Sequence, residues 1–599
     1  MQLQFKDTFI GYLKFYKNIV GNHLFLYLGV TVLVGVLDGF GLAMFIPLLT
    51  AASGDVSTTG GDQSMGNLKF LVDFLQSSGI SLTLNNILIF LVLLFSLKGL
   101  IYFFQIKYYA FIRYLFLTKL RFALVDDLQN LTYEGYTKID SGRIQNNLVG
   151  EVGKLFSTMN SYFQSAQTTI LLLTYVGLAF IANWQFAILI GIGGGVSNIF
   201  FRRIYRATKN ASKAISAKGN DFNAYLIQAV IYFKYLKATN FFRRYADKLR
   251  KVIKETESLN LRMGHYQAIV LGIREPVTIL VIGLVISVQV NYLGGSLSSI
   301  LVSLLFFYRA LTSLTALQTN WQAFIQNVGS MESVSSMSHK MQLYSERKNK
   351  LPYTTPFKNI VTENLSLSYG EKSILTKINI TVNKNETIAF VGESGAGKTS
   401  LANMLAGLVL PTTGRVLLDG KIDLNSIHLD DFRSNIGYIT QDPVIFNDSI
   451  FNNITFWQEC NEVNMARFNK AVELASLSSF ISSLPDKENS MLGDHGMLIS
   501  GGQKQRISIA RELYKEVDLL ILDEATSALD SETEKIIKEN IECLKGKYTM
   551  IVIAHRLSTI KNADRIYLLG NGQVQYTGSF DELIGQSSQF KKMVELQNL

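Results

Sequence analysis

The first half of the chain alternates long apolar runs with stretches rich in Lys and Arg. The apolar runs cover about residues 24–49, 86–106, 158–200, 267–291 and 297–326, and the third of these is long enough for two spans. An α-helix needs roughly 20 apolar residues to cross a bilayer. The pattern therefore predicts six membrane-spanning helices, with a break between the third and fourth near Ala182 and Asn183.

The placement of the basic residues predicts the orientation of these helices. The chain has a formal net charge of +10, and residues 202–262 are dense in Lys and Arg, whereas the polar connection 50–64 contains neither. Lys and Arg accumulate in cytosolic loops of membrane proteins. Residues 50–64 are therefore expected outside, with both termini and two long helical hairpins in the cytosol. This orientation accounts for the basic charge without nucleic-acid binding.

The ends of this region differ from the spans. Residues 1–22 interleave Lys with aromatic residues, which favours an interfacial amphipathic helix over a cleavable signal. Residues 331–356 are polar and contain two prolines, which indicates a linker. The predicted organisation is an interfacial elbow helix at 1–23, a transmembrane domain at 24–330, a linker at 331–356 and a nucleotide-binding domain at 357–599.

The last part of the chain has the alternation of a soluble α/β domain. From residue 357 on, β-rich stretches alternate with helical stretches, which predicts a nucleotide-binding domain with a parallel sheet. The only cysteines, Cys460 and Cys543, lie in this part. Two isolated cysteines suggest neither a disulfide framework nor a Cys-rich metal site, which suits a reducing cytosolic compartment.

A phosphate-binding loop is the strongest chemical signal. Gly392–Thr399 reads GESGAGKT, which fits G-x-x-x-x-G-K-[ST], and it lies between a short apolar β-rich run and a stretch with helical spacing. The glycines allow backbone N–H groups to surround phosphate oxygens at the positive end of the next helix. Lys398 then supplies charge to the β- and γ-phosphates, and Thr399 supplies a hydroxyl to Mg²⁺.

Two further motifs fit hydrolysis of a nucleotide. The apolar run 519–522 is followed by Asp523 and Glu524, so that one carboxylate can hold Mg²⁺ and the next can polarise the attacking water. Residues 499–503, ISGGQ, precede a helical stretch and predict a second anion-binding helix N-terminus.

Together these residues resemble the ATP-binding cassette (ABC) transporter family, specifically its exporter half-transporters. The resemblance covers nearly the whole chain. It rests on GESGAGKT, ISGGQ, ILDE, SALD at 527–530, Gln441 in YITQDP and His555 in IVIAHR. Ile499 replaces the usual Leu of the signature, and Asp494 stands where a Glu is common. The implied fold is a six-helix transmembrane domain of the type IV exporter kind followed by an α/β P-loop domain, with ATP hydrolysis coupled to transport.

The resemblance also implies the roles of individual residues, with ATP and Mg²⁺ as cofactors. Tyr369 would stack on adenine, Gln441 would couple the metal site to the membrane domain, and His555 would contact the γ-phosphate. Catalysis is assigned to Glu524, His555, Gln441 and Lys398, and metal binding to Thr399, Gln441 and Asp523. The ATP-binding set is Tyr369, Gly392, Glu393, Ser394, Gly395, Ala396, Gly397, Lys398, Thr399, Ser400, Ser500, Gly501, Gly502, Gln503 and Asp530.

A single cassette implies a partner. In this family ATP lies between the P-loop of one cassette and the signature of another, so a dimer is expected, either with a second copy or with a paralogous half-transporter. The cytosolic helix pairs would transmit the motion through coupling turns near residues 133–142 and 222–239.

Ionisable residues within the apolar runs are candidates for a substrate cavity. Each costs about 2.5 to 3.5 kcal/mol at a helix centre, so they should face a cavity or pair with one another. Lys98 can instead extend to the interface, and Arg274 and Glu275 can pair near Pro276. The cavity candidates are Asp38, Arg274, Glu275 and Arg309.

The substrate class stays open between a lipid and a drug or peptide, and an ATP-gated channel on the same scaffold is a third alternative. Residues 66–79 have apolar positions at helical spacing and predict an external amphipathic helix. Similar helices occur in lipid-linked oligosaccharide flippases of the ABC family, which favours a lipid or lipid-linked oligosaccharide. That helix can also simply cap the first two spans.

Overall fold

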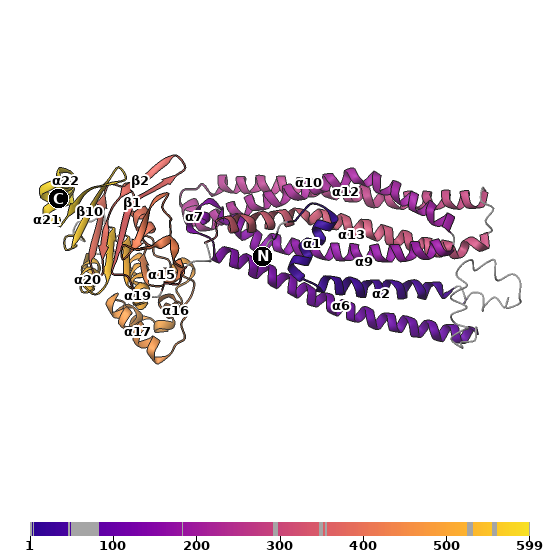
Figure 1. Cartoon of the computed structure of the whole chain (residues 1–599), viewed down its shortest axis with the longest axis horizontal. Coiled ribbons are helices and arrows are strands. Elements are labelled where there is room, and N and C mark those ends of the chain that lie inside the picture. Colours follow the sequence, from indigo (N-terminus) through magenta and orange to yellow (C-terminus); the bar gives the residue numbers. More distant parts are fainter. Residues whose placement is uncertain are drawn as a thin grey trace. The chain divides into compact units, whose positions relative to one another are not determined.

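The computed structural model describes residues 3, 5–45, 48, 83–182, 184–291, 297–346, 351–353, 356–523, 531–553 and 560–597. It divides into two compact units, Met1–Leu131 with Gly135–Ser345 and Thr132–Glu134 with Glu346–Leu599. Each unit is described by itself, with the element labels of Figure 1. The predicted external helix at 66–79 lies outside the described residues.

The first unit is built from helices. Six of the described helices have 21 residues or more and run alongside one another, as the six-span prediction requires (Figure 1). Helix α9 ends at Ala182 and α10 begins at Trp184, which agrees with the break predicted near Ala182. The helices are α1 (Phe9–Val20), α2 (His23–Ala43), α6 (Leu84–Gln129), α7 (Tyr133–Lys138), α8 (Ser141–Asn146), a π-helix η2 (Asn147–Glu151), α9 (Val152–Ala182), α10 (Trp184–Ile231), α11 (Phe233–Ala238), α12 (Phe242–Asn291) and α13 (Leu297–Leu343).

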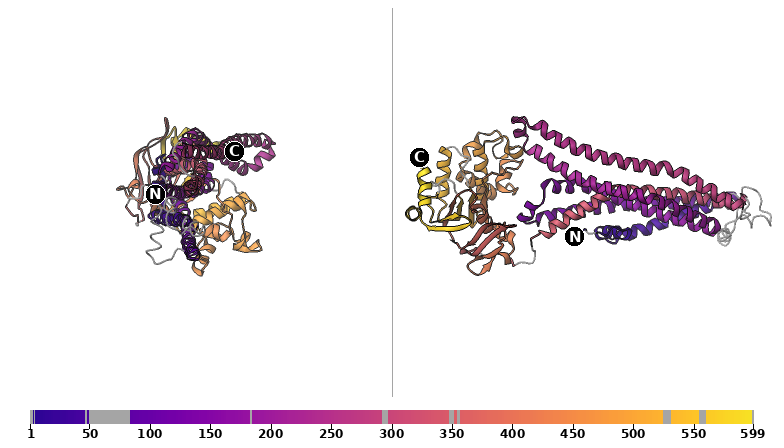
Figure 2. Two further views of the ribbon diagram at one scale, coloured as in Figure 1. Left: turned by 90° about the vertical axis from the view of Figure 1, so that its right-hand side faces the viewer. Right: turned by 90° about the horizontal axis from the view of Figure 1, so that it is seen from above.

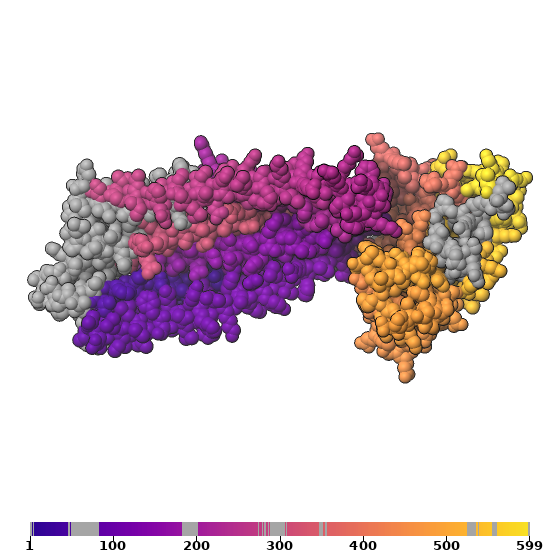
Figure 3. Space-filling model, turned by 180° about the vertical axis from the view of Figure 1, so that it is seen from behind, coloured from indigo at the N-terminus to yellow at the C-terminus, as the bar shows by residue number. Residues whose placement is uncertain are grey.

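Three helical stretches among the described residues are long and apolar enough to cross a membrane. They are His23–Ala43, Leu84–Gln129 and Ser141–Ile181. Helix α6 exposes large apolar side chains along much of its length, among them Leu88, Val92 and Phe103, and it lies open on one face of the first unit (Figure 3). Short helices α7, α8 and α11 occupy the places where coupling turns are predicted. In Figure 2, α10 and α12 form a pair that diverges from the other helices toward α11.

Helix α1 has the amphipathic character predicted for the N-terminus. Thr8 caps its start by accepting a hydrogen bond from the backbone N–H of Gly11. Tyr12 and Tyr16 are buried in an aromatic core, where the Tyr16 hydroxyl donates to Thr158 Oγ1 at 2.9 Å. Ile10 is exposed on the opposite side. One face of the helix is therefore anchored to the bundle, and the other is open.

The predicted linker at 331–356 is wrong in its first half. Helix α13 continues to Leu343 without interruption. Met331, Val334, Met337 and Met341 are fully buried within it, at a spacing that keeps them on one face. The serines between these positions gave the segment a polar composition that concealed this apolar stripe.

The second unit contains the parallel sheet expected and, in addition, an antiparallel sheet. One has the order β2-β1-β5-β6, with β3 also paired to β1, and its pairs are antiparallel. The other has the order β11-β10-β4-β9-β8-β7 and is parallel except for its β10–β11 edge. The strands are β1 (Asn359–Tyr369), β2 (Lys372–Ile378), β3 (Thr381–Asn383), β4 (Thr387–Gly392), β5 (Thr413–Leu418), β6 (Ile422–Asp423), β7 (Ile436–Ile439), β8 (Leu519–Asp523), β9 (Thr549–Ile553), β10 (Arg565–Gly570) and β11 (Gln573–Gly578).

The parallel sheet is covered on both faces. Alternate residues of β4 enter different cores: Ile388 and Phe390 pack in one, and Ala389 and Val391 in the other. Because successive strand side chains point to opposite faces, a strand buried on both sides reads as a continuous apolar run. The helices of this unit are α14 (Lys398–Leu405), α15 (Leu429–Arg433), α16 (Ile450–Thr455), α17 (Glu462–Leu474), α18 (Ser478–Ser483), α19 (Gly501–Tyr514), α20 (Ser531–Glu542), α21 (Phe580–Gln586) and α22 (Ser588–Gln597).

Candidate functional site

The parallel strands bring the predicted nucleotide-site residues to one edge of the sheet. Phe390 of β4 is in register with Ile553 of β9, and Ile553 is in register with Asp523 of β8. The carboxyl ends of parallel strands meet at the same edge, where ligands of open α/β sheets bind. The P-loop after β4, Asp523 at the end of β8 and Gln441 after β7 therefore share this edge.

The P-loop needs glycine at two positions for steric reasons. Gly392 has φ 153°, and a Cβ there would lie 2.2 Å from the carbonyl oxygen of Leu569. Gly397 has φ 96°, and a Cβ there would lie 2.6 Å from Leu375 Cδ2. Any side chain at these positions would force the loop to move. Helix α14 begins directly after Gly397, so its free N–H groups face the loop.

Lys398 lies across this loop. Its side chain is buried, and its Nζ donates to the carbonyl oxygens of Gly392 at 2.8 Å and Glu393 at 3.0 Å. The ammonium group is thereby held at the position where the loop closes. Thr399 is exposed at the first turn of α14, so its hydroxyl is accessible.

A cavity of about 990 Å³ opens above the loop. All P-loop residues from Glu393 to Ser400 line it, together with Gln441 and Ile553. Its volume reaches the upper end of the range of about 300 to 1,000 Å³ for small-molecule pockets. A nucleoside triphosphate fits this combination of N–H donors, lysine and space.

Sequence reasoning missed part of the cavity wall. Lys372 of β2, Gln575 of β11 and Gln589 of α22 line it. Gln589 Nε2 donates to Glu393 Oε1 at 3.2 Å, which connects the last helix to the P-loop. No motif marks these residues, because their position depends on the pairing of β10 with β11 and on the packing of α22.

Tyr369 is the last residue of β1 and is 48% exposed. It pairs with Lys372 in the β1–β2 register, and Lys372 lines the cavity. Tyr369 is therefore the cross-strand neighbour of a residue that lines the cavity wall.

The signature residues form a separate element. Ser500 caps α19 through a capping box with Gln503, in which the Ser500 N–H donates to Gln503 Oε1 at 2.8 Å. Of the described residues, neither these two nor Gly501 and Gly502 line the 990 Å³ cavity of their own chain. The signature thus presents a pre-formed helix N-terminus away from that cavity.

Three predicted site residues, Glu524, Asp530 and His555, lie outside the described residues. The strand residues that precede two of them are described. Asp523 is buried at the end of β8, and Ile553 lines the cavity at the end of β9.

An unpredicted arginine connects the signature helix to the segment after Gln441. Arg511 of α19 is buried and donates to the carbonyl oxygens of Asn453 at 2.6 Å and Val444 at 2.8 Å. Its guanidinium also lies over the rings of Phe446 and Phe456. Burial lowers the pKa of Arg511 from its ordinary high value, and the carbonyl oxygens compensate its charge.

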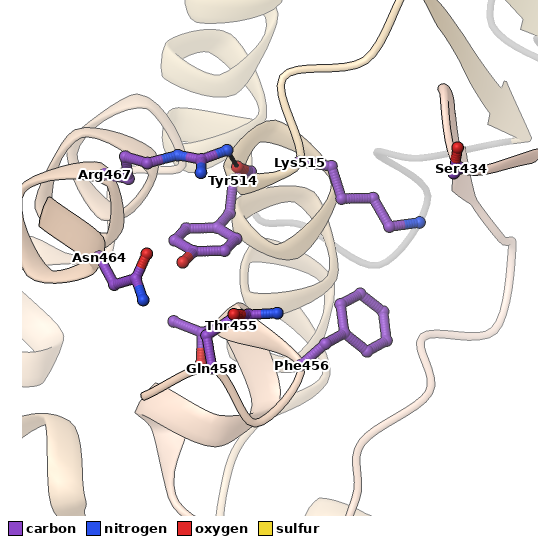
Figure 4. Close-up of a pocket in the computed structure, with 8 residues that line it drawn as sticks. All are labelled: Ser434, Thr455, Phe456, Gln458, Asn464, Arg467, Tyr514 and Lys515. Atoms are coloured by element: carbon purple, nitrogen blue, oxygen red, sulfur yellow. Dashed lines mark hydrogen bonds between the residues drawn. The ribbon is translucent and has the colours of Figure 1, made fainter. Parts of the chain in front are cut away.

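A second cavity of the cassette, of about 470 Å³, lies beside α17 and α19 (Figure 4). Arg467 and Tyr514 form part of its wall, and Arg467 Nη2 donates to the Tyr514 carbonyl oxygen at 3.0 Å. The two cavities are lined by different residues of the cassette.

In the first unit, Asp38 forms the centre of a polar cluster among apolar helices. Lys98 of α6 pairs with one of its carboxylate oxygens, and the Tyr175 hydroxyl of α9 donates to the other. Lys98 therefore pairs with a carboxylate, which is one of the two outcomes expected of these ionisable residues, and not the alternative of extending to the interface. Glycines let α2 approach α9 closely: a Cβ at Gly39 would lie 2.8 Å from side-chain atoms of Thr174 and Leu178.

The other cavity candidates, Arg309, Glu275 and Arg274, lie on helices α12 and α13. Arg309 is exposed on α13, beside Ala310, which packs in one cluster with Tyr175. Glu275 is exposed on α12, next to Pro276 within the helix. The side chain of Arg274 lies outside the described part of the chain. Asp38 is thus hydrogen-bonded to Tyr175, and Arg309 lies next in sequence to a residue that packs in the same cluster as Tyr175.

The motifs and both units have counterparts in known proteins. Residues 375–527 match the family model described as ABC transporter. The chain is 30% identical over 505 residues to an ATP-dependent lipid A-core flippase from Cupriavidus pinatubonensis, covering 80% of this chain and 82% of the relative. A protein of the same name from Syntrophus aciditrophicus is 29% identical over 522 residues, covering 85% and 84%.

A further relative of that name from Francisella tularensis is 26% identical over 493 residues, covering 80% of this chain and 79% of the relative. Among solved structures, a bacterial Atm1-family ABC exporter with ATP bound superposes with a TM-score of 0.80 at 21% identity, covering 97% of this chain and 100% of the other. At that identity the superposition establishes the shared fold. The chain therefore belongs to the ATP-binding cassette transporter family, as an exporter-type half-transporter that spans the membrane and couples ATP hydrolysis to export.

Proposed function

We propose that the protein exports or flips a lipid-type, amphipathic substrate across the cytoplasmic membrane by alternating access, with its cassette in the cytosol. The observation that carries this proposal is the similarity to a lipid A-core flippase, which extends over 82% of that relative and so includes the membrane unit. The distribution of Lys and Arg supports the orientation.

The polar cluster supports an amphipathic substrate. Arg309 has no carboxylate partner among the described residues, and a guanidinium suits a phosphate-bearing head group. Asp38 pairs with Lys98, so Lys98 is already neutralised, whereas Arg309 is exposed on α13 and is proposed to meet the anion. Arg274 and Glu275 complete the proposed polar part of the cavity.

The cassette residues have the following proposed roles. Glu524 acts as the base toward the attacking water, and His555 contacts the γ-phosphate. Thr399 and Asp523, with Gln441, supply the oxygen ligands that Mg²⁺ prefers. When bound, Mg²⁺ would neutralise charge on the β- and γ-phosphates. Lys398 contributes the second positive charge, and Tyr369 contributes a stacking surface for the base.

The active form is proposed to be a dimer, with a second copy as the simplest partner. Ser500 to Gln503 and Asp530 would complete the nucleotide site of the other chain. Two observations favour a partner: the signature residues do not line the described cavity of their own chain, and the α11 region is strongly apolar and open. In that region Val230, Ile231, Tyr232, Phe233 and Tyr235 are each half or more exposed.

Transport by reconstituted protein tests the proposal. We expect ATP-dependent movement of fluorescent lipid A between the leaflets of proteoliposomes, and stimulation of ATPase activity by lipid A. Glu524→Gln is the matched control: it keeps the side-chain shape, removes the base and should bind ATP without turnover.

Stimulation by soluble drugs alone, with no lipid A movement, would overturn the lipid proposal and favour a drug exporter. Near-parental turnover by Glu524→Gln would overturn the role of Glu524. Comparison of lipid A with its dephosphorylated form in the parent and in Arg309→Ala separates recognition of the head group from recognition of the acyl chains.

A further inference from the structure

A cavity of about 340 Å³ in the first unit is far in the sequence from every motif described above. Helix α10 contributes Lys209 and Lys213, one turn apart, and the segment before α1 contributes Phe5 and Asp7. Helix α13 forms the opposite wall. The volume lies within the usual range of about 300 to 1,000 Å³ for small-ligand pockets.

The position of the cavity indicates which molecules it meets. The apolar runs of the fourth and sixth spans end near residues 200 and 326, and the lining residues of α10 and α13 begin after them, at Lys209 and at Val328. The amphipathic helix α1 begins two residues after Asp7 and exposes Ile10. In the orientation proposed above, the cavity therefore lies at the level of the lipid head groups of the cytosolic leaflet.

The Lys, Asp and Glu side chains that line the cavity form two separate ion pairs, and His339 lines the same wall. Lys213 Nζ lies 2.6 Å from Glu332 Oε2, and Lys209 pairs with Asp7, which also accepts a hydrogen bond from Tyr12. Burial by itself would raise the pKa of Asp7, but the hydrogen bonds from Lys209 and Tyr12 lower it, so the carboxylate is charged at neutral pH. The two pairs therefore sum to zero charge.

This balance discriminates between head groups. A purely anionic head group that paired with a lysine would displace a carboxylate and leave it without its cation. A head group with both a phosphate and an ammonium can pair with lysine and carboxylate together, so that all charges stay compensated. A primary ammonium also donates N–H hydrogen bonds, which a trimethylammonium cannot do.

We propose that this cavity binds a resident membrane lipid of the phosphatidylethanolamine type, with its phosphate at Lys209 and Lys213 and its ammonium at Glu332. Ser336 from α13 adds a hydroxyl to the polar wall. Phe5 and Val328 provide apolar contacts near the glycerol. The bound lipid holds the N-terminal segment against α10 and α13. The inference rests on the proposed orientation, but not on the identity of the transported substrate.

Lipid retention by the full-length protein tests this site without ATP. The protein is placed in nanodiscs that contain equal amounts of phosphatidylethanolamine, phosphatidylcholine and phosphatidylglycerol, then extracted gently and analysed by native mass spectrometry. We expect retention of phosphatidylethanolamine over phosphatidylcholine on the order of tenfold, which corresponds to one or two charge-assisted hydrogen bonds.

Two variants test the contacts of the ammonium and of the phosphate separately. Glu332→Gln should reduce this preference to near unity, because the ammonium loses its carboxylate, and Lys209→Gln with Lys213→Gln should abolish retention. Glu257→Gln on α12 and Lys234→Gln on α11 are matched controls outside the cavity and should retain the parental preference. Lys213→Arg keeps the positive charge and should keep retention, which distinguishes loss of that charge from misfolding.

Preferential retention of phosphatidylglycerol, or a preference unchanged in Glu332→Gln, would overturn the zwitterionic assignment. Equal retention of all three lipids would overturn the proposal that the cavity is a lipid-binding site. Neither outcome bears on lipid A movement in proteoliposomes, so failure here and failure of the proposed transport function are distinguishable.

Discussion

The ion pair between Asp38 and Lys98 is expected to contribute measurably to the stability of the membrane unit. It connects α2 to α6, and the Tyr175 hydroxyl connects the same carboxylate to α9. Asp38→Asn keeps the shape of the side chain and removes its charge. The ammonium of Lys98 then remains inside the bundle without a counter-charge.

The exposure of the two side chains sets the magnitude. Removing one partner of a fully buried pair costs about 3 to 5 kcal/mol, whereas exposed pairs contribute about 0 to 1 kcal/mol. The Asp38 side chain is 17% exposed and that of Lys98 is 26% exposed. We therefore expect a loss between these limits, about 2 kcal/mol for Asp38→Asn, which lowers Tm by about 4 to 8 °C in a domain of 150–250 residues and by less in a larger one.

A double-mutant cycle measures this pair. Thermal unfolding is followed in nanodiscs for Asp38→Asn, Lys98→Met and the double variant, with Lys107→Met on the exposed part of α6 as the control. The double variant should be more stable than Asp38→Asn alone, because no uncompensated charge remains. Strictly additive losses, or a Lys98→Met effect no larger than that of Lys107→Met, would refute the reasoning.

Three further predictions concern the cassette. Lys398→Ala should weaken ATP binding as well as turnover, because the lysine charge acts on ground-state phosphates; unchanged affinity in equilibrium titration with labelled ATP would contradict this. Mixing Ser500→Arg chains with Lys398→Ala chains should restore one composite site, so the mixture should show more ATPase activity than either variant alone. Activity no higher than that of the separate variants would count against a shared site. Arg511→Lys should lower the free energy of unfolding of the cassette by about 2 kcal/mol, because lysine cannot replace the planar guanidinium that bonds to both Asn453 and Val444. An unchanged Tm would show that these two hydrogen bonds are dispensable.

Local patterns were sufficient for the succession of long helices and for the nucleotide motifs. The spans follow from apolar length, and the P-loop follows from glycines whose backbone angles and close contacts allow no other residue. The order of Gln441, Asp523 and the P-loop along the chain also implies one site, because parallel strands place their carboxyl ends on one edge. Each of these inferences depends on neighbours within a few residues or on a general rule of sheet geometry.

Contacts between distant segments needed the tertiary structure. The partner of Asp38 is 60 residues away and Tyr175 is 137 residues away, so no local spacing distinguishes an ion pair from a side chain that reaches the interface. The continuation of α13 to Leu343 is likewise decided by the core that receives Met337 and Met341. Burial of those methionines outweighs the weak helical preference of the serines between them, because packing of an apolar face supplies most of the stability of a helix in a folded protein.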